Sequence, residues 1–237
     1  MTRPMGEMDD SLFHKIIKDG KEIRASLFAP CLNGEPFVFP RIWEWLDYME
    51  KEKVSVGLYT NAELMDVDRL IRYNNIRYVH CSFNGATEET YNKVMRGPKF
   101  EIAKNNIKEL IKRAKFKTMV LFIEVEENTH EVELFRKMWG KSLIRGRFIN
   151  YAGARHSKLE KQGDKKPCYS ILNKMAILWD GRVVPCCMDY NGSQIVGDVN
   201  TQSLADIWHN TYWMRKKHRN LEFDIPLCKD CNYNLKI

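Results

Sequence analysis

Four cysteines toward the carboxyl end of the chain have the spacing of a metal-binding site. Cys168 precedes the run Trp179–Gly181, Cys186 follows that run, and a Cys-x2-Cys pair closes the series at Cys228 and Cys231. Thiolates are soft ligands, and four of them suit either zinc or an iron–sulfur cluster. In a chain whose thiols stay reduced, such spacing predicts a metal centre rather than a disulfide framework.

The other three cysteines leave alternatives open. Cys187 adjoins Cys186, and because neighbours on a strand point to opposite faces, we choose Cys186 as the ligand and keep Cys187 as the alternative. Cys31 and Cys81 lie near the ends of predicted strands, with His80 beside the second. No spacing rule connects them, so we interpret each as a small buried hydrophobic side chain. The alternative is a metal site of two thiolates and a histidine.

The elements that must hold these residues alternate along the first 150 residues. Strand-like segments cover 23–29, 54–59, 76–82, 119–125 and 143–150, and helical stripes cover 42–49, 100–114 and 132–139. Strands that alternate with helices predict an α/β fold with a parallel sheet. Five such units are fewer than the eight that close a full barrel, so we expect a partial (β/α) barrel.

The cysteine-bearing end follows a different pattern. Residues 152–167 are polar, which predicts a linker. Asp180-Gly181 predicts a hairpin that brings Cys186 back toward Cys168, and Ser203 with Asp206 predicts a helix start. We therefore predict a barrel domain over 1–151, a linker over 152–167 and a small Cys-rich α+β domain over 168–237.

Bulk composition bears on location and partners. The 237 residues are 44% hydrophobic, residues 1–12 lack a secretory apolar region, and no apolar run is long enough for a bilayer, so we predict a cytoplasmic protein without a membrane partner. The net charge of +7 divides evenly along the chain. Residues 1–120 contain 20 Lys and Arg against 17 Asp and Glu, a net +3, and residues 121–237 contain 18 against 14, a net +4. Nucleic-acid binders concentrate charge, so we predict no nucleic-acid partner. The basic run 215–219 is interpreted as a solvated helix end, with anion binding as the alternative.

The cysteine series resembles the SPASM or twitch-type auxiliary-cluster domain of radical S-adenosylmethionine (SAM) enzymes. The resemblance covers roughly residues 168–232 and includes the segments Cys168–Ser170, Trp179–Asp189, Gly197–Val199, Ser203–Trp208 and Pro226–Cys231. It implies a [4Fe-4S] cluster rather than zinc, held by Cys168, Cys186, Cys228 and Cys231. We expect one auxiliary cluster, because no cysteine follows Cys231.

The first half resembles the barrel of the same family. Asn33–Pro36 resembles the Gly-Gly-Glu-Pro motif, which in the family meets the amino group of SAM, and a glycine lets the backbone approach closely. Leu58–Asn61 and Ser82–Thr87 follow at the ends of the next two strands, where barrel enzymes place their sites. The resemblance implies that SAM meets Gly34, Glu35, Pro36, Thr60, Asn61, Ser82 and Arg96. Asn84 stands where the family usually has Asp.

The sequence contains no Cys-x3-Cys-x2-Cys run, which in the family holds the cluster that reduces SAM. Residues 3–17 resemble the stretch that normally follows this loop. We therefore expect the first barrel strand and its loop upstream of Met1, and a reductive [4Fe-4S] cluster only if that segment exists. The alternative is a chain that has lost the reductive cluster.

The resemblance implies an enzyme that generates a 5′-deoxyadenosyl radical from SAM and modifies a peptide or small-molecule substrate, with flavodoxin or ferredoxin as electron donor. One alternative is a degenerate, non-catalytic iron–sulfur protein that transfers electrons or binds a complete enzyme. Another is a zinc-stapled binding module. The sequence indicates no single residue as a catalytic base or radical quencher.

Overall fold

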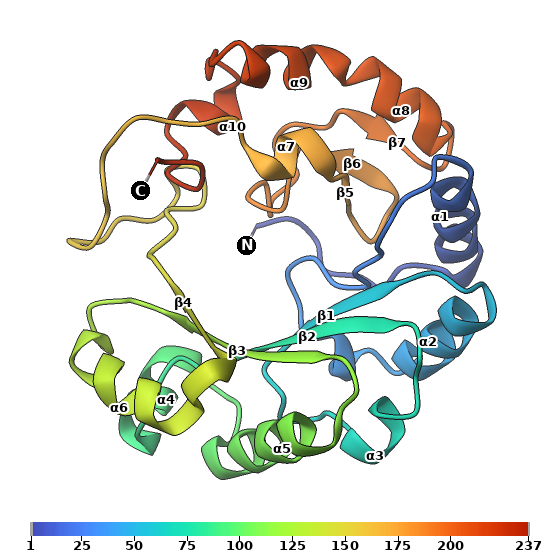
Figure 1. Cartoon of the computed structure of the whole chain (residues 1–237). Helices are drawn as coiled ribbons and strands as arrows, with labels where there is room; N and C mark the ends of the chain where they lie inside the picture. The colour runs from blue at the N-terminus through green and yellow to red at the C-terminus, as the bar shows by residue number, and fades with distance from the viewer. Residues whose placement is uncertain (1, 237) are drawn as a thin grey trace. The chain divides into compact units, whose positions relative to one another are not determined.

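The computed structural model describes residues 2–236, which form two compact units (Figure 1). One unit is Ser26–Phe148, and the other joins the described residues up to Ala25 with those from Ile149 onward. The predicted domains over 1–151, 152–167 and 168–237 stay a prediction. No helix within residues 2–236 is long and apolar enough to cross a membrane.

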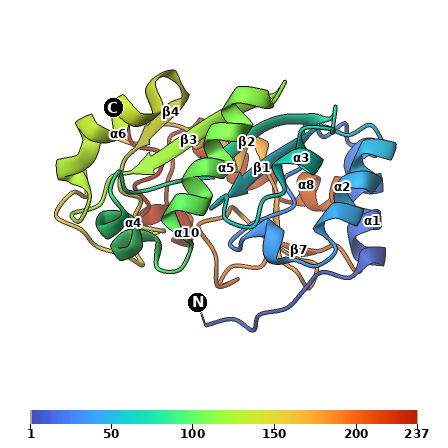
Figure 2. The same ribbon diagram turned by 90° about the horizontal axis from the view of Figure 1, so that it is seen from below.

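A four-stranded parallel sheet is the framework of the Ser26–Phe148 unit. Its strands lie in the order β1 (Val56–Thr60), β2 (Ile76–Ser82), β3 (Lys117–Ile123) and β4 (Leu143–Gly146). Figures 1 and 2 show the connecting helices on one face of this sheet. The predicted α/β fold with parallel strands is therefore confirmed. The connections are η1 (Pro36–Val38), α2 (Ile42–Lys51), α3 (Val67–Leu70), α4 (Glu88–Met95), α5 (Phe100–Arg113), η2 (Thr129–Glu131), α6 (Val132–Trp139) and η3 (Gly140–Ser142).

Alternating burial fixes the register of the strands. Val79 and Cys81 of β2 and Val120 and Phe122 of β3 are almost fully buried, while the residues between them are partly exposed. Shifting a strand by one residue would turn this apolar set away from the helices. Because the strands are parallel and in register, their carboxyl ends meet at one edge of the sheet.

The predicted strand over 23–29 is wrong for most of its length. Residues up to Glu22 belong to α1 (Asp10–Glu22), which Asp9 caps by accepting a hydrogen bond from the Ser11 backbone N–H. Arg24 then adopts a left-handed φ of 56° and turns the chain. Phe28 makes an isolated parallel bridge to Val56. Within 23–29, Ile23 is thus the C-cap of α1, Arg24 lies in a turn, and Phe28 pairs with the sheet.

The second unit is built on a small antiparallel sheet. Its hairpin turns at Asp180-Gly181, as predicted, and Gly181 has the φ of +91° that such a turn requires. The Ser203 side chain caps α8 by accepting from the Asp206 backbone N–H, also as predicted. The elements are α1, α7 (Tyr169–Asn173), β5 (Ala176–Ile177), β6 (Arg182–Val184), β7 (Gly197–Asp198), α8 (Leu204–Asn210), α9 (Tyr212–Arg219) and α10 (Pro226–Lys229).

Helix α1 belongs to this cysteine-bearing unit. Leu12 and Ile16 share one apolar core with Val183 of β6 and with Leu204 and Ile207 of α8. We predicted no helix there. Its buried apolar residues Leu12, Phe13, Ile16 and Ile17 have helical spacing and follow the Asp9 cap, so the prediction missed a signal that the sequence contains.

Candidate metal-cluster and cofactor sites

The structure brings the four predicted cysteine ligands together. Each is buried, and all four lie in one apolar cluster with Met188, Met214 and other hydrophobic side chains. They come from three places in the chain: the N-cap of α7, the turn after β6, and α10 with the turn that follows it. The members are Cys168, Cys186, Cys228 and Cys231.

The thiols are close enough to influence one another's ionisation. Burial, together with the negative charge that Cys231 and Cys168 would carry, raises the pKa of Cys228 to about 12. Burial likewise raises the pKa of Cys186, with smaller contributions from Cys187, Cys168 and Cys228. Without a cation, Cys186 and Cys228 are therefore protonated at neutral pH. A metal centre that binds thiolate would deprotonate them, so the set fits a thiolate-ligated group.

Backbone N–H groups also point at the sulfurs. The Tyr233 N–H donates to Cys231 Sγ at 3.5 Å, and the Met188 N–H donates to the Cys186 thiol. Hydrogen bonds of this kind stabilise thiolate more than thiol, and they are one of the means by which proteins tune iron–sulfur clusters. The surroundings of Cys186 and Cys231 therefore also fit thiolate ligands.

Polar contacts hold the loop that carries the last two cysteines. Asn150 and Asn232 exchange hydrogen bonds, each side-chain oxygen accepting from the other's backbone N–H at 3.0 and 3.2 Å. Lys165 Nζ donates to the carbonyl oxygens of Cys228 (2.6 Å) and Lys229 (2.5 Å) at the end of α10. The predicted linker thus contributes the Lys165 side chain to the contacts that fix the cysteine loop.

Cys186 and Cys187 lie in a turn rather than on a strand, because the Asp189 N–H donates to the Cys186 carbonyl at 3.1 Å. The strand-based reason for preferring Cys186 was therefore wrong. Cys187 is half-buried and packs against the same cluster. Within residues 2–236, no three His, Cys, Asp or Glu side chains converge as ligands of a single metal ion. In a [4Fe-4S] cluster each thiolate binds a different iron, so its ligands need not converge in that way.

Three of the predicted SAM residues meet at the carboxyl edge of the parallel sheet. The Glu35 carboxylate accepts hydrogen bonds from Thr60 Oγ1 at 2.7 Å and from the Asn61 N–H at 2.6 Å. It also caps η1 by accepting from the Phe37 N–H at 3.2 Å. Burial raises the pKa of Glu35, and these hydrogen bonds oppose that effect. The carboxylate thus ties the Gly34–Pro36 loop to the end of β1.

The other predicted SAM residues lie at or near the same edge without joining this network. A side chain at Gly34 would meet nothing within 4 Å, so its backbone is accessible to a ligand. Ser82 is the last residue of β2, one position beyond Cys81, which pairs with Thr60. Arg96 is exposed at the C-cap of α4, with a left-handed φ of 54°. Within residues 2–236, neither Ser82 nor Arg96 hydrogen-bonds to Glu35.

Asn84 has a structural role that suits an amide. Its Oδ1 accepts from the Ile123 N–H at 2.8 Å, which ties the end of β3 to the loop after β2. Its Nδ2 donates to Met95 Sδ at 3.2 Å, which a carboxylate in its place could not do. The departure from the family's Asp therefore has a local explanation.

Cys31 and Cys81 are not brought together with a third ligand among the described residues. The Cys31 thiol donates to the Gly34 carbonyl at 2.7 Å, and burial raises its pKa to about 11. Cys81 is fully buried on the helix-covered face of the sheet, and burial raises its pKa to about 12. These contacts match two neutral thiols, Cys31 half-buried and Cys81 buried, rather than a metal site.

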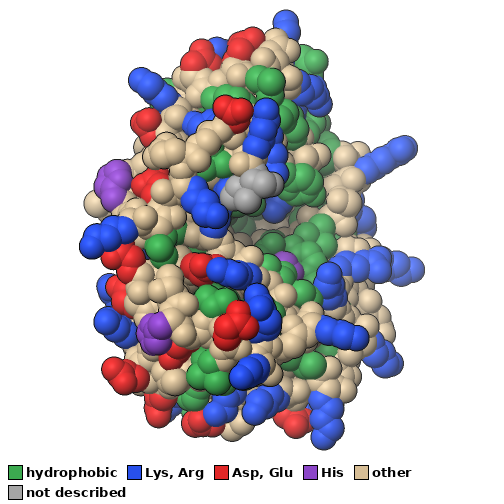
Figure 3. Space-filling model, turned by 60° about the vertical axis from the view of Figure 1, so that its left-hand side comes forward, with side chains coloured by type: hydrophobic (Ala, Val, Ile, Leu, Met, Phe, Trp, Pro, Cys, Tyr) green, Lys and Arg blue, Asp and Glu red, His purple; other side chains and the backbone are tan. Residues whose placement is uncertain are grey.

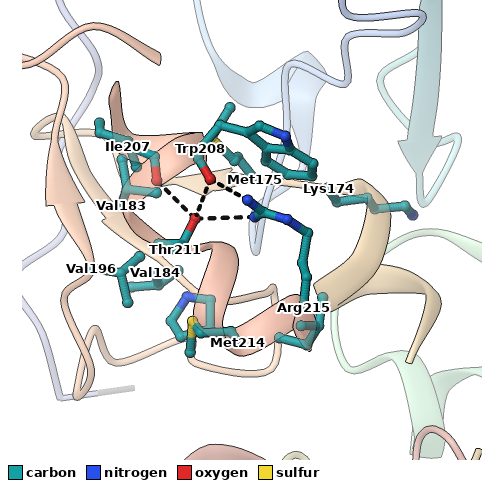
Figure 4. Close-up of a pocket in the computed structure, with 12 residues that line it drawn as sticks. Lys174, Met175, Val183, Val184, Val196, Ile207, Trp208, Thr211, Met214 and Arg215 are labelled. Atoms are coloured by element: carbon teal, nitrogen blue, oxygen red, sulfur yellow. Dashed lines mark hydrogen bonds between the residues drawn. The ribbon is translucent and has the colours of Figure 1, made fainter. Parts of the chain in front are cut away.

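The basic run 215–219 is not wholly solvated. Arg215 and His218 are buried, at 4% and 0% exposed. The Arg215 guanidinium stacks on the Trp208 ring at 3.8 Å and donates to Thr211 Oγ1 and the Trp208 carbonyl (Figure 4). The adjoining cavity of about 20 Å³ has room for one water molecule, so it is not a substrate pocket. Sequence inspection missed His218 because its charged neighbours made the segment look solvent-exposed.

Two sequence profiles match the chain. That of the Radical SAM superfamily matches residues 11–137, and that of SPASM, an iron–sulfur cluster-binding domain, matches residues 168–232. The tungsten-containing aldehyde ferredoxin oxidoreductase cofactor-modifying protein of Pyrococcus furiosus is 22% identical over 96% of this chain and 80% of its own length. The S-adenosyl-L-methionine-dependent 2-deoxy-scyllo-inosamine dehydrogenase of Niallia circulans is 34% identical over 22% of each chain.

Solved structures share the fold. SuiB of Streptococcus suis, bound to its precursor peptide SuiA, has a TM-score of 0.73 and 14% identity, over 91% of this chain and 62% of its own. The structure of anSMEcpe with bound AdoMet has a TM-score of 0.67 and 15% identity, over 95% of this chain and 80% of its own. BtrN in complex with AdoMet and 2-DOIA has a TM-score of 0.59 and 16% identity, over 97% of this chain and 82% of its own.

Proposed function

The chain belongs to the radical SAM superfamily, and on that premise we propose that Cys168, Cys186, Cys228 and Cys231 hold one auxiliary [4Fe-4S] cluster. The radical SAM and SPASM domains imply iron–sulfur clusters and SAM as cofactors. The observation that carries the assignment is the shared burial of these four thiols, which come from separate parts of the sequence. Cys31 and Cys81 are not gathered with other thiols in this way, and four thiols in one cluster are what a centre with four thiolate ligands requires.

The proposed activity is that of a radical SAM enzyme, or of the larger part of one. When bound, SAM and a reductive cluster supply radical chemistry that removes hydrogen from a substrate. The chain's own contribution is to bind and orient SAM. Glu35 holds the Gly34–Pro36 loop against Thr60 and Asn61, and the exposed backbone at Gly34 offers acceptors to the ammonium of SAM. Ser82 and Arg96 are proposed to reach its carboxylate or ribose.

A peptide or a small molecule is proposed as substrate, a flavodoxin or ferredoxin as electron donor, and the cytoplasm as location. SuiB was solved with a precursor peptide and BtrN with 2-DOIA, so this fold accommodates both kinds of ligand. Seven unpaired cysteines support a reducing compartment.

Anaerobic reconstitution with iron and sulfide tests the cluster assignment. We expect about four irons and four sulfides per chain and a broad visible absorbance. Cys168→Ala, Cys228→Ala and Cys231→Ala should each abolish the signal, whereas Cys81→Ala should keep it. Comparing Cys186→Ala with Cys187→Ala decides between these two neighbours. Stoichiometric zinc without visible absorbance, or full iron content in the first three variants, would refute the assignment.

A second candidate is a non-catalytic iron–sulfur protein that transfers electrons or binds a complete radical SAM enzyme, since residues 1–237 carry the proposed auxiliary-cluster cysteines but no Cys-x3-Cys-x2-Cys run. The two candidates differ in whether the protein cleaves SAM. Formation of methionine and 5′-deoxyadenosine with dithionite as reductant would support the enzyme. A reconstituted, reducible protein that forms neither product would support the second candidate.

A further inference from the structure

His218 lies between two of the proposed cluster ligands. It is fully buried on α9, where its Nδ1 is 3.2 Å from the backbone nitrogen of Cys168 and its Nε2 is 3.3 Å from Cys228 Sγ. Phe223 packs edge-on against the ring, with the ring centroids 5.2 Å apart. Both ring nitrogens therefore have partners, and packing limits how the ring can turn.

The contact with Cys168 fixes the tautomer of this ring. A backbone N–H can only donate, so His218 Nδ1 must present its lone pair. In the neutral ring the proton then sits on Nε2, which donates it to Cys228 Sγ. A ring oriented in this way cannot bind metal through Nε2, since that nitrogen carries the proton.

We propose that His218 is a positioning residue that donates a hydrogen bond from Nε2 to the Cys228 thiolate and raises the reduction potential of the auxiliary cluster. The inference rests on the proposed function, in which Cys228 is a cluster ligand. Reduction adds negative charge that is shared with the thiolate sulfurs, and a hydrogen-bond donor stabilises this charge. The donor therefore favours the reduced cluster over the oxidised one.

Among the side chains described above near the four cysteines, His218 alone donates a hydrogen bond to a cysteine sulfur. Lys165 contacts the cysteine loop, but its Nζ donates to the carbonyl oxygens of Cys228 and Lys229 rather than to a sulfur. The contacts of Cys186 and Cys231 described above come from backbone N–H groups, which substitution does not remove. His218 is thus the point at which a substitution can change a sulfur hydrogen bond without changing a ligand.

Two amide variants separate the functions of the ring. His218→Asn keeps an acceptor near the Nδ1 position for the Cys168 N–H but removes the donor to Cys228. His218→Gln places an amide NH2 near the Nε2 position and keeps that donor. His209, exposed on α8 in the same unit, provides the control His209→Asn. The measurements are iron content, the midpoint potential of the reconstituted full chain, and proton ENDOR of the reduced cluster before and after exchange into D2O.

We expect all variants to bind iron as the wild type does. His218→Asn should have a more negative potential and lack one exchangeable proton coupling, while His218→Gln stays closer to the wild type and His209→Asn matches it. Equal potentials in the wild type and an iron-loaded His218→Asn would overturn the inference. So would loss of iron from both His218 variants, which would make the residue purely structural. A wild type that binds no cluster would instead refute the proposed function.

Discussion

Burial determines the chemistry of the carboxylate at the proposed SAM site. Glu35 is partly buried, and burial raises its pKa. Three hydrogen-bond donors converge on its carboxylate and oppose this effect by stabilising the ionised form. Two of these donors belong to Thr60 and Asn61, at the end of β1. The carboxylate thus holds the Gly34–Pro36 loop against the end of β1, and the backbone of Gly34 remains accessible to a ligand.

Glu35→Ala should therefore weaken SAM binding through loss of loop order. Removing the carboxylate leaves the Thr60 hydroxyl and the Asn61 N–H without their acceptor, at a cost of about 1–3 kcal/mol for each buried group. We expect SAM affinity to fall about tenfold or more, measured by isothermal titration calorimetry of the reconstituted protein. Glu44→Ala, an exposed carboxylate on α2, is the matched control. If Glu35→Ala binds SAM with unchanged affinity, Glu35 does not contribute to SAM binding and the prediction is contradicted.

Residue types and spacing predicted which cysteines the structure gathers in one cluster but not their environment. Cys168, Cys228 and Cys231 were identified because a thiolate site requires particular side chains at particular intervals. His218 was not, because its importance comes from a packing arrangement that buries one residue of a charged run. The preference for Cys186 over Cys187 relied on a strand, and the chain forms a turn there instead.

At the scale of elements, a buried carboxylate from one connection holds the start of another. Glu131, which ends η2, accepts hydrogen bonds from the Ala86 and Thr87 N–H groups and from Thr87 Oγ1, just before α4. Burial alone would raise the pKa of Glu131, but the hydrogen bonds from Thr87, Ala86 and Thr90 together lower it. This carboxylate therefore stabilises the folded state in its ionised form.

The pH dependence of stability should reveal this carboxylate. The pKa of Glu131 is lower in the folded state than in the unfolded state, where it is near 4.3. Its contribution to the free energy of unfolding is therefore fully present above the unfolded-state pKa, and it is lost as the pH falls through the folded-state pKa. Glu131→Gln should cost about 1–3 kcal/mol at pH 7 and reduce the loss of stability below about pH 4.5. Urea unfolding of the wild type and variant between pH 7 and pH 3 measures both effects. Glu133→Gln, exposed on α6, should behave like the wild type. Parallel pH profiles for the Glu131 variant and the wild type would contradict the prediction.

The elements that the sequence predicted best are those with a self-contained pattern. β2 spans Ile76–Ser82 as expected, and α5 follows its stripe from Phe100 to Arg113. α1 was missed although its apolar residues have helical spacing, and the strand predicted beside it was mostly wrong because Arg24 turns the chain. Local periodicity could indicate this helix but not its packing partners, which lie near residues 183–207.

At the scale of the whole molecule, charge gives no sign of a nucleic-acid surface on the face that Figure 3 shows. Lys and Arg side chains are spread over that face with Asp and Glu between them. This mixture agrees with the even division of the net charge of +7 along the sequence.

The two compact units should respond differently to loss of the cluster. The Ser26–Phe148 unit has a core of its own, which includes the fully buried Leu58, Val79 and Val120. In the other unit, the cysteine ligands join α7, the turn after β6 and the loop around α10, each of which is short. Ligation supplies much of the folding free energy of segments that lack a large core.

Chelation of iron should therefore unfold these segments locally. We expect hydrogen–deuterium exchange after chelation to lose protection over residues 168–188 and 226–236, while β1 to β3 keep theirs. Cys168→Ala, compared with the cluster-loaded wild type, should give the same pattern without a chelator, and Cys81→Ala should not. Loss of protection that extends equally to β1 to β3 would mean that the cluster stabilises the chain as a whole. Unchanged protection over both segments would mean that apolar packing around Met188 and Met214 suffices to hold the cysteines in place.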